Sequence, residues 1–493
     1  MLRTDVASEL RAGRDPLGEE FLTARPAASR RRRGAVYTPK SIVDAMIAWA
    51  KAHGTPDRVV DPGAGSGRFA LAAAEAFPLA EVVAVEVDPD ATAVLRANAD
   101  AAELGHRVRA IEADYRSVRL PKIPGRTLFI GNPPYVRHHN IEPHWKSWYS
   151  RGAAAYGLPT SQLAGLHLHF FLKSRQLAAP GDYGIFITAA EWLEVNYGKT
   201  LRTLLLNGMG GLSVDMFQAD NRVFGDAMTT AVVTCFEVGA EPRDLAIGVM
   251  PDLNGVIRFG AGRRVSAEVL SAEPRWTVFT RSAAARQDDL DAAECFRLGD
   301  LFRVKRGQVT GMNRVWIAGS QTPPLPRRFL VPTITKAREL IASGGALTDP
   351  AGLRRVIDLP ADLSHLAANE IEDIGRFLDW AKSLNADQSY IARHRAAWWA
   401  VGLYDPAPIL VTYMGRRSPV FVRNQCGARH INIAHGLYPK RFLSPATLDR
   451  LVSWLNRNVG RELGRIYAGA LVKFEPREVE RIPIPQRQFI RTQ

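Results

Sequence analysis

The sequence has little cysteine and no long apolar run. Only three of its 493 residues are cysteines, and Cys235, Cys295 and Cys426 lie far apart. This spacing excludes a disulfide framework and a zinc motif, so we expect reduced thiols and no metal site. Charged residues interrupt every apolar stretch well before the ~20 residues that a membrane span needs. The charged first residues also lack the apolar core of a signal peptide, so we expect a cytoplasmic protein without a membrane partner.

Lysine is scarce in the basic part of the chain. The last 197 residues contain 30 lysines and arginines against 16 acidic residues, an excess equal to the whole net charge of +14. Only five of those 30 cations are lysines, and the planar fork of arginine suits phosphates and guanine edges. A GC-rich genome also favours arginine, but it does not explain why residues 1–296 are neutral. The asymmetry predicts a nucleic-acid-binding C-terminal domain.

The chain is long enough for at least two domains. Residues 1–34 are polar and end in a run of arginines. They predict a basic N-terminal arm, which is either solvated or in contact with phosphates. Residues 35–295 alternate between strand and helix patterns, although 240–295 carry no motif. Residues 296–493 are rich in proline, arginine and tryptophan, lack that alternation, and predict a second, mixed α+β domain.

The alternation in residues 35–295 indicates an α/β fold. Helical periodicity predicts helices at 41–52, 70–76, 91–104 and 166–177. Short β-rich runs predict strands at 58–60, 82–87, 108–113, 127–130, 183–188, 212–217 and 229–236. This order is typical of a doubly wound, mostly parallel, seven-stranded sheet, and we expect the last two strands to form an antiparallel hairpin on its edge. Ligands bind such sheets beyond the carboxyl ends of the strands.

A glycine-rich loop follows the first predicted strand and opens a helix. In Asp-Pro-Gly-Ala-Gly-Ser-Gly, residues 61–67, the glycines Gly63, Gly65 and Gly67 allow a tight turn and a close approach to a ligand. A dehydrogenase loop is the rival interpretation. However, Asp61 would repel a pyrophosphate and could pair with an ammonium group. The loop also lacks the Lys-Ser/Thr pair of a phosphate-binding loop.

Acidic residues end the next two strands. Glu86 ends the second, where a carboxylate can accept both hydroxyls of a ribose. Asp114 ends the third, where it could accept from an adenine amine. One such acid is often only a solvated strand end. Three acids at three successive strand ends predict a nucleoside-like cofactor.

The segment Asn132-Pro133-Pro134-Tyr135 follows the fourth strand and is the most specific motif of the chain. Two prolines fix the backbone and remove two donors, so carbonyls beside them can point into a pocket. The Asn132 side-chain oxygen and the Pro133 carbonyl can accept hydrogen bonds from one amine, and Tyr135 offers a flat apolar face. A proline-rich turn with an aromatic cap is the alternative for the segment taken alone.

These motifs together resemble the adenine-N6 DNA methyltransferases of the gamma class, of the restriction-modification type. Val-Tyr-Thr-Pro at 36–39, the glycine loop, Asn132 to Tyr135 and Val-Phe-Gly at 223–225 match the family's order, as do the first and last segments of the second domain, at 302–311 and 469–478. The resemblance implies a class I, Rossmann-like catalytic domain at 35–295 and a target-recognition domain at 296–493. It implies methyl transfer from S-adenosylmethionine to N6 of an adenine flipped out of the duplex.

The resemblance also assigns expected roles to single residues. Those expected to be catalytic are Asn132, Pro133, Pro134, Tyr135 and Phe224. Those expected to bind S-adenosylmethionine are Tyr37, Thr38, Asp61, Gly63, Gly65, Gly67, Glu86, Asp114 and Asn132. Charge and neighbouring aromatic residues, not the resemblance, indicate the residues expected to contact double-stranded DNA, which are Arg303, Lys305, Arg306, Arg416 and Arg417.

Other functions are compatible with parts of the sequence. A protein glutamine methyltransferase shares Asn-Pro-Pro-Tyr but lacks a large basic C-terminal domain. An RNA adenine methyltransferase and a catalytically inactive DNA-binding subunit are further alternatives. We find no Asp…Glu-x-Lys nuclease pattern, so a restriction endonuclease is expected as a separate partner, not as a fused activity.

Overall fold

The computed structural model describes residues 6, 8–10, 12, 14–23, 38–217, 230–240, 244–250, 257–280, 296–467 and 471–485. The chain divides into two compact units. The first comprises residues 1–282 with 467–469, and the second comprises residues 283–466 with 470–493. The predicted boundary at 295 and 296 adjoins residues 281–295, which lie outside the described part, so it stays a prediction.

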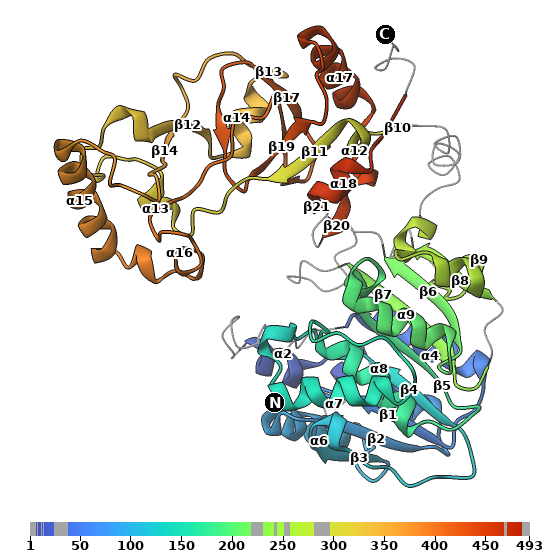
Figure 1. The fold of residues 1–493 in the computed structure, drawn as a ribbon. Helices are drawn as coiled ribbons and strands as arrows, with labels where there is room; N and C mark the ends of the chain where they lie inside the picture. Colours follow the sequence, from blue (N-terminus) through green and yellow to red (C-terminus); the bar gives the residue numbers. More distant parts are fainter. Residues whose placement is uncertain are drawn as a thin grey trace. The chain divides into compact units, whose positions relative to one another are not determined.

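The first unit is built on one nine-stranded sheet in the order β3-β2-β1-β4-β5-β7-β6-β8-β9 (Figure 1). Its strands are β1 (Arg58–Pro62), β2 (Glu81–Glu86), β3 (Val108–Glu112), β4 (Thr127–Gly131), β5 (Tyr183–Ala189), β6 (Gly211–Phe217), β7 (Ala231–Glu237), β8 (Asp244–Met250) and β9 (Arg263–Ser266). Strands β3, β2, β1, β4 and β5 pair in parallel, whereas β7 is antiparallel to both β5 and β6.

The doubly wound, mostly parallel class is confirmed, but two details of the prediction were wrong. Within the described residues the sheet has nine strands, not seven, because β8 and β9 extend it. The hairpin of β6 and β7 is antiparallel as expected, yet it lies inside the sheet, since β8 pairs in parallel with β6. Strand β8 comes from residues 240–295, for which the sequence carried no motif.

Helices cover both faces of this sheet, which explains why its central strands β1, β4 and β5 are buried throughout. On one face lie α4 (Lys40–His53), α5 (Arg68–Ala76) and α6 (Pro89–Ala101). On the other lie α7 (Pro143–Ala154), α8 (Leu166–Leu177), α9 (Lys199–Leu206) and α10 (Ala267–Ala272). Within β4, Leu128 and Ile130 pack toward the first face and Phe129 toward the second. Helices α7 and α9 were not predicted.

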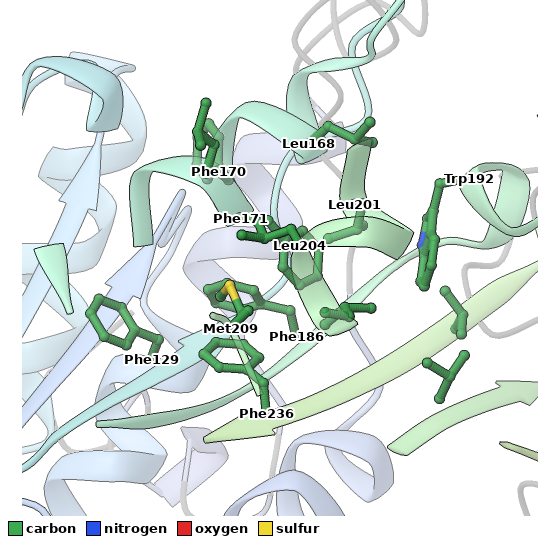
Figure 2. Packing of buried hydrophobic residues seen from close by; sticks show 14 of the residues in the cluster. Phe129, Leu168, Phe170, Phe171, Phe186, Trp192, Leu201, Leu204, Met209 and Phe236 are labelled. Atoms are coloured by element: carbon green, nitrogen blue, oxygen red, sulfur yellow. The ribbon is translucent and has the colours of Figure 1, made fainter. Parts of the chain in front are cut away.

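The core of the second face is aromatic. Phe129, Phe186 and Phe236 come from β4, β5 and β7, and they meet Phe171 of α8 (Figure 2). The rings of Phe171 and Phe186 meet edge to face, with centroids 5.2 Å apart. This packing fixes the central strands, whose carboxyl ends carry the predicted site.

Short elements join these layers. They are α2 (Pro16–Thr23), η1 (Tyr115–Ser117), η2 (His138–Asn140), η3 (Ala190–Leu193), η4 (Asn196–Gly198) and η5 (Trp276–Thr280). Helix α2 falls within residues 1–34, which were predicted as an arm.

The second unit is a mixed α+β domain, as predicted. A five-stranded sheet has the order β11-β19-β15-β17-β13, and two three-stranded sheets and one pair accompany it. The strands are β10 (Phe296–Arg297), β11 (Phe302–Arg306), β12 (Leu330–Ile334), β13 (Ala346–Leu347), β14 (Arg355–Ile357), β15 (Ile409–Thr412), β16 (Met414–Gly415), β17 (Phe421–Asn424), β18 (Arg429–His430), β19 (Ala434–Pro439), β20 (Arg465–Tyr467), β21 (Leu471–Lys473) and β22 (Pro483–Ile484).

Helices pack on these sheets from several sides. They are α12 (Leu298–Leu301), α13 (Asn313–Trp316), α14 (Ala337–Ala342), α15 (Ala368–Ser383), α16 (Tyr390–Arg393), α17 (Pro445–Asn458) and α18 (Pro476–Glu480), with the single turns η7 (Arg327–Phe329), η8 (Ala386–Gln388) and η9 (Arg461–Leu463). Helix α17 buries Leu448, Leu451 and Leu455 in the same core as β11 and β15. In the described part of the chain, no helix is both long and apolar enough to cross a bilayer.

Candidate active site

The glycine-rich loop connects β1 to α5 at the carboxyl edge of the sheet. Gly63, Gly65 and Gly67 have φ values of 75°, 55° and 93°, the left-handed region that other residues adopt only with strain. The buried side chain of Asp61 at the end of β1 accepts a hydrogen bond on Oδ2 from the Ala70 backbone N–H, at 3.0 Å. Asp61 thereby holds the loop against the first turn of α5.

The other carboxylate oxygen of Asp61 is the atom of this loop that can bind a ligand. Asp61 Oδ1 is buried and has no hydrogen-bond partner among the residues that the structure describes. Burial raises the pKa of Asp61 to about 8. An acceptor of this kind suits a ligand that brings its own donor, above all an ammonium group.

Glu86 at the end of β2 binds the same loop. Its Oε2 accepts from the Gly65 N–H at 2.9 Å, and its Oε1 accepts from Val87 and Asp88 N–H groups at 2.9 Å each. Burial raises the pKa of this carboxyl. A carboxylate offers about four acceptor positions. Three of these positions are in use. About one therefore remains for a ribose hydroxyl, whereas the sequence predicted that Glu86 accepts from both hydroxyls.

Asp114 lies beyond the end of β3, as predicted, but its carboxylate is engaged by an arginine. Arg116 donates from Nε to Oδ1 at 2.9 Å and from Nη2 to Oδ2 at 2.6 Å. The Arg116 guanidinium also lies 4.0 Å from the ring centroid of Trp145. Sequence reasoning missed this arginine, although the Asp-x-Arg spacing was the available signal. An adenine amine would share Asp114 with Arg116.

The Asn-Pro-Pro-Tyr segment follows β4 directly and contacts the glycine loop. A Cβ on Gly131 would lie 2.7 Å from Asp61 Oδ1, so only glycine lets the end of β4 approach β1 this closely. A Cβ on Gly63 would lie 3.2 Å from Pro134 Cδ. The structure therefore brings Asp61, the glycines and the Asn-Pro-Pro-Tyr segment together at one edge of the sheet.

The side chains of this segment are partly enclosed. Asn132 is half-buried and donates from Nδ2 to the hydroxyl of buried Thr38, at 3.0 Å. The Tyr135 hydroxyl donates to the Ile187 carbonyl at 3.5 Å. The Tyr135 ring meets the buried His167 ring edge to face, with centroids 6.4 Å apart. Burial raises the pKa of Tyr135 well above its ordinary value and lowers that of His167 to about 4. Both side chains are neutral near pH 7.

Two predicted site residues cannot be placed. Tyr37 and Phe224 lie in residues 24–37 and 218–229, outside the described part of the chain.

The described histidines near the site do not gather around a metal position. His169 stacks on Tyr149, with centroids 4.4 Å apart. Among the described residues, no three His, Cys, Asp or Glu side chains are arranged to hold a metal ion.

The predicted DNA-contacting residues lie in the second unit. Arg303 and Arg306 of β11 are exposed, and so are Arg416 and Arg417 in the loop after β16. Lys305 is half-buried, and its Nζ lies between two tyrosines, 4.9 Å from the Tyr404 ring centroid and 5.0 Å from that of Tyr438.

Two cations from different strands, Arg306 of β11 and Lys473 of β21, contact the ring of Tyr413. Arg306 and Lys473 lie 5.1 Å and 4.9 Å from the ring centroid of Tyr413. This places a cation of β11 beside one of β21. Sequence reasoning missed Tyr413, which precedes Arg416 by three residues. By contrast, Arg395 donates from Nη2 to the Val309 carbonyl at 2.8 Å, so its charge supports the fold.

Family models match most of this chain in separate segments. The model for the type II methyltransferase M.Eco57I, C-terminal domain, matches residues 275–493, and that for the Eco57I restriction-modification methylase matches 125–224. The TRM5/TYW2 methyltransferase domain matches 35–152. Type II methyltransferase M.XamI of Xanthomonas campestris pv. amaranthicola is 52% identical over 92% of this chain and 85% of its own length.

More distant proteins match in fold or in part. The structure of the type IIL restriction-modification enzyme MmeI in complex with DNA has a TM-score of 0.62 at 13% identity, over 93% of this chain and 69% of that one. The release factor glutamine methyltransferase of Mycobacterium leprae is 35% identical over 20% of this chain and 35% of its own length. The tRNA1(Val) (adenine(37)-N6)-methyltransferase of Porphyromonas gingivalis is 34% identical over 18% and 38%.

Proposed function

Because the chain belongs to the type II DNA methyltransferases of restriction-modification systems, we propose that it methylates N6 of adenine at a specific site in double-stranded DNA. One arrangement supports this proposal above all others. Asn132 to Tyr135 follow β4, and Pro134 packs against Gly63 of the glycine loop. Direct transfer of a methyl group to an amine requires that the group that binds the amine and the loop that binds the cofactor lie in contact.

The methyl donor of this family is S-adenosylmethionine, which supplies an electrophilic methyl group when it is bound. The site fits this cofactor, since the buried Asp61 Oδ1 has no hydrogen-bond partner among the described residues and could accept from its ammonium group. We propose that Asp61 and the three glycines hold the amino-acid end, and that Glu86 accepts from the ribose. Asp114 is the proposed acceptor for the adenine amine, with Thr38 and Tyr37 completing the site.

The residues of this chain have to activate the target amine as a nucleophile. The lone pair of an aromatic amine is delocalised, which makes the amine a poor nucleophile. Asn132 Oδ1 and the Pro133 carbonyl would both accept from it and stabilise the positive charge that develops in the transition state. Pro133 and Pro134 lack N–H groups and fix the backbone that aims these oxygens. Neither Asn132 nor Tyr135 has to ionise.

The target base must leave the duplex to reach this pocket. Flipping costs a few kcal/mol, and stacking on an aromatic ring returns about 1–3 kcal/mol. We propose Tyr135 and Phe224 as the stacking residues. The second unit would supply DNA affinity and site choice through Arg303, Lys305, Arg306, Arg416 and Arg417. A separate endonuclease that cuts the same unmethylated site is the partner that we propose.

The test is to identify the methylated product. Purified protein with labelled S-adenosylmethionine is offered duplex DNA, RNA of the same sequence and a release factor, and the products are hydrolysed and separated. We expect label in N6-methyladenine from DNA. Label in N4-methylcytosine would contradict the choice of base, and label only in RNA or in protein glutamine would contradict the substrate. No label in any of the three would indicate an inactive DNA-binding subunit.

A further inference from the structure

The hydrogen bond between Thr38 and Asn132 joins two segments that lie 94 residues apart in the sequence. Asn132 Nδ2 donates to Thr38 Oγ1 at 3.0 Å. Thr38 is buried, with 3% of its surface exposed. The sequence assigned Thr38 to the cofactor, but in the structure its hydroxyl contacts the side chain proposed to activate the target amine.

This contact matters because the two ends of an amide have opposite hydrogen-bonding character. The oxygen accepts two hydrogen bonds and the NH2 group donates two, although they are almost equal in shape. The proposed reaction needs the oxygen of Asn132 toward the target amine. A half-turn of the amide would present two donors to another donor, and the amine would lose one of its two proposed acceptors.

Thr38 can hold the Asn132 amide in place because its own backbone is fixed. Pro39 follows it, which restricts Thr38 to extended conformations, and Pro39 also caps α4. The carbonyl of Thr38 accepts from Arg68 Nη1 at 3.3 Å, and Arg68 is the first residue of α5. The backbone of Thr38 is therefore held between the start of α4 and the start of α5.

We propose that Thr38 is a positioning residue that anchors the Asn132 amide for methyl transfer, in the orientation that the structure shows. This inference rests on the proposed function, because it requires Asn132 Oδ1 to accept from the target amine. Thr38 does not have to touch the substrate. Its hydroxyl accepts from Nδ2, and the oxygen of Asn132 consequently lies on the side of the amide that faces away from Thr38.

The experiment compares Thr38→Val, Thr38→Ala and Thr38→Ser. Valine keeps the shape of threonine but removes the acceptor, alanine guards against a folding defect of the valine variant, and serine restores the hydroxyl. For each, the single-turnover rate is measured at saturating S-adenosylmethionine and DNA, with the Kd of S-adenosylmethionine from calorimetry. Thr200→Val is the matched control, because Thr200 is a buried threonine of α9 whose hydroxyl donates to the Pro159 carbonyl.

We expect Thr38→Val and Thr38→Ala to lower the saturated rate at least about tenfold, the effect of one lost hydrogen bond in the transition state. Thr38→Ser should keep most of the rate, and Thr200→Val should leave it unchanged. An unchanged saturated rate with a raised Kd would overturn the proposal, because Thr38 would then serve the cofactor alone. Equal losses in the serine and valine variants would overturn it as well.

Failure of the proposed function would look different. If Asn132→Ala retained its rate, the role of Asn132 itself would be wrong. If Asn132→Ala lost its rate while Thr38→Val kept it, only the positioning role would be wrong.

Discussion

At the scale of single residues, the side-chain amide of Asn132 supplies one of the two proposed acceptors for the target amine. We predict that Asn132→Ala lowers the single-turnover rate by at least about 100-fold, since an acceptor that acts in the transition state is lost. The Kd values of S-adenosylmethionine and of DNA should change much less. Rapid-quench assays and titrations measure these quantities. Asn140→Ala is the control, because Asn140 is exposed in η2 near the same segment. A normal rate for Asn132→Ala would refute the mechanism.

Asp61 leads to a prediction about pH. Burial raises its pKa to about 8, so the carboxyl holds its proton near neutral pH in the cofactor-free protein. Pairing with an ammonium group needs the carboxylate, and binding of S-adenosylmethionine should therefore release a proton. Affinity should rise as the pH increases from about 6 to about 7.5, by up to about tenfold per unit.

Calorimetry in buffers of different ionisation enthalpy measures both the affinity and the released proton. Asp61→Asn cannot ionise, so it should bind more weakly at about pH 7.5 and lose most of the pH dependence. A wild-type affinity that is flat or falls over this range would contradict the assigned pairing.

At the scale of elements, α2 is part of the folded cofactor domain, although residues 1–34 were predicted as an arm. The buried Asp15 before this helix accepts on Oδ1 from Asn98 Nδ2 at 2.9 Å and from the Gly18 N–H at 2.8 Å. Its Oδ2 accepts from the Ser66 hydroxyl of the glycine loop. The segment before α2 thus contacts both α6 and the loop.

We predict that Asp15→Ala destabilises the protein by about 1–3 kcal/mol, because it removes one acceptor of the buried Asn98 amide and the acceptor of the Ser66 hydroxyl. It should also raise the Kd of S-adenosylmethionine, since the glycine loop loses a support. Urea unfolding measures the first effect and calorimetry the second. Asp44→Ala is the control, an exposed aspartate that pairs with Lys40 on α4, and should cost under about 0.5 kcal/mol. Equal effects of the two variants would show that α2 does not support the loop.

At the scale of the whole molecule, the charge asymmetry predicts a division of labour. The net charge of +14 lies in the last 197 residues, whereas the proposed chemistry lies in the first unit. We predict that Arg306→Ala weakens binding to all DNA sequences alike. It should reduce the slope of log K against log salt by about 0.9, the value for one phosphate contact.

Fluorescence anisotropy over a range of salt concentrations measures this slope. Arg376→Ala is the matched control, because Arg376 is an exposed arginine of α15 whose charge is met by Asp373 and Glu372. An unchanged slope for Arg306→Ala, or an equal change in both variants, would remove Arg306 from the proposed DNA contacts.

The sequence by itself determined seven strands of the first unit and the order of the motifs at the candidate site. Short β-rich runs located β1 to β7, because strands buried between helix layers are rich in apolar residues. The glycines Gly63, Gly65 and Gly67 marked a loop with left-handed backbone, since other side chains are strained there. Carboxylates at strand ends needed no knowledge of strand order, because parallel strands end at the same edge. These signals are all local in the chain.

Only the tertiary structure decided which side chains meet. Strands β8 and β9 extended the sheet, and β7 lay between β5 and β6, because pairing depends on packing between distant segments. Asp15 supports the glycine loop across 51 residues of sequence, and Thr38 accepts from Asn132 across 94. Each of these contacts depends on how two distant backbones are placed. Residue type and spacing do not encode such distances, which arise when the helices and the sheet pack together.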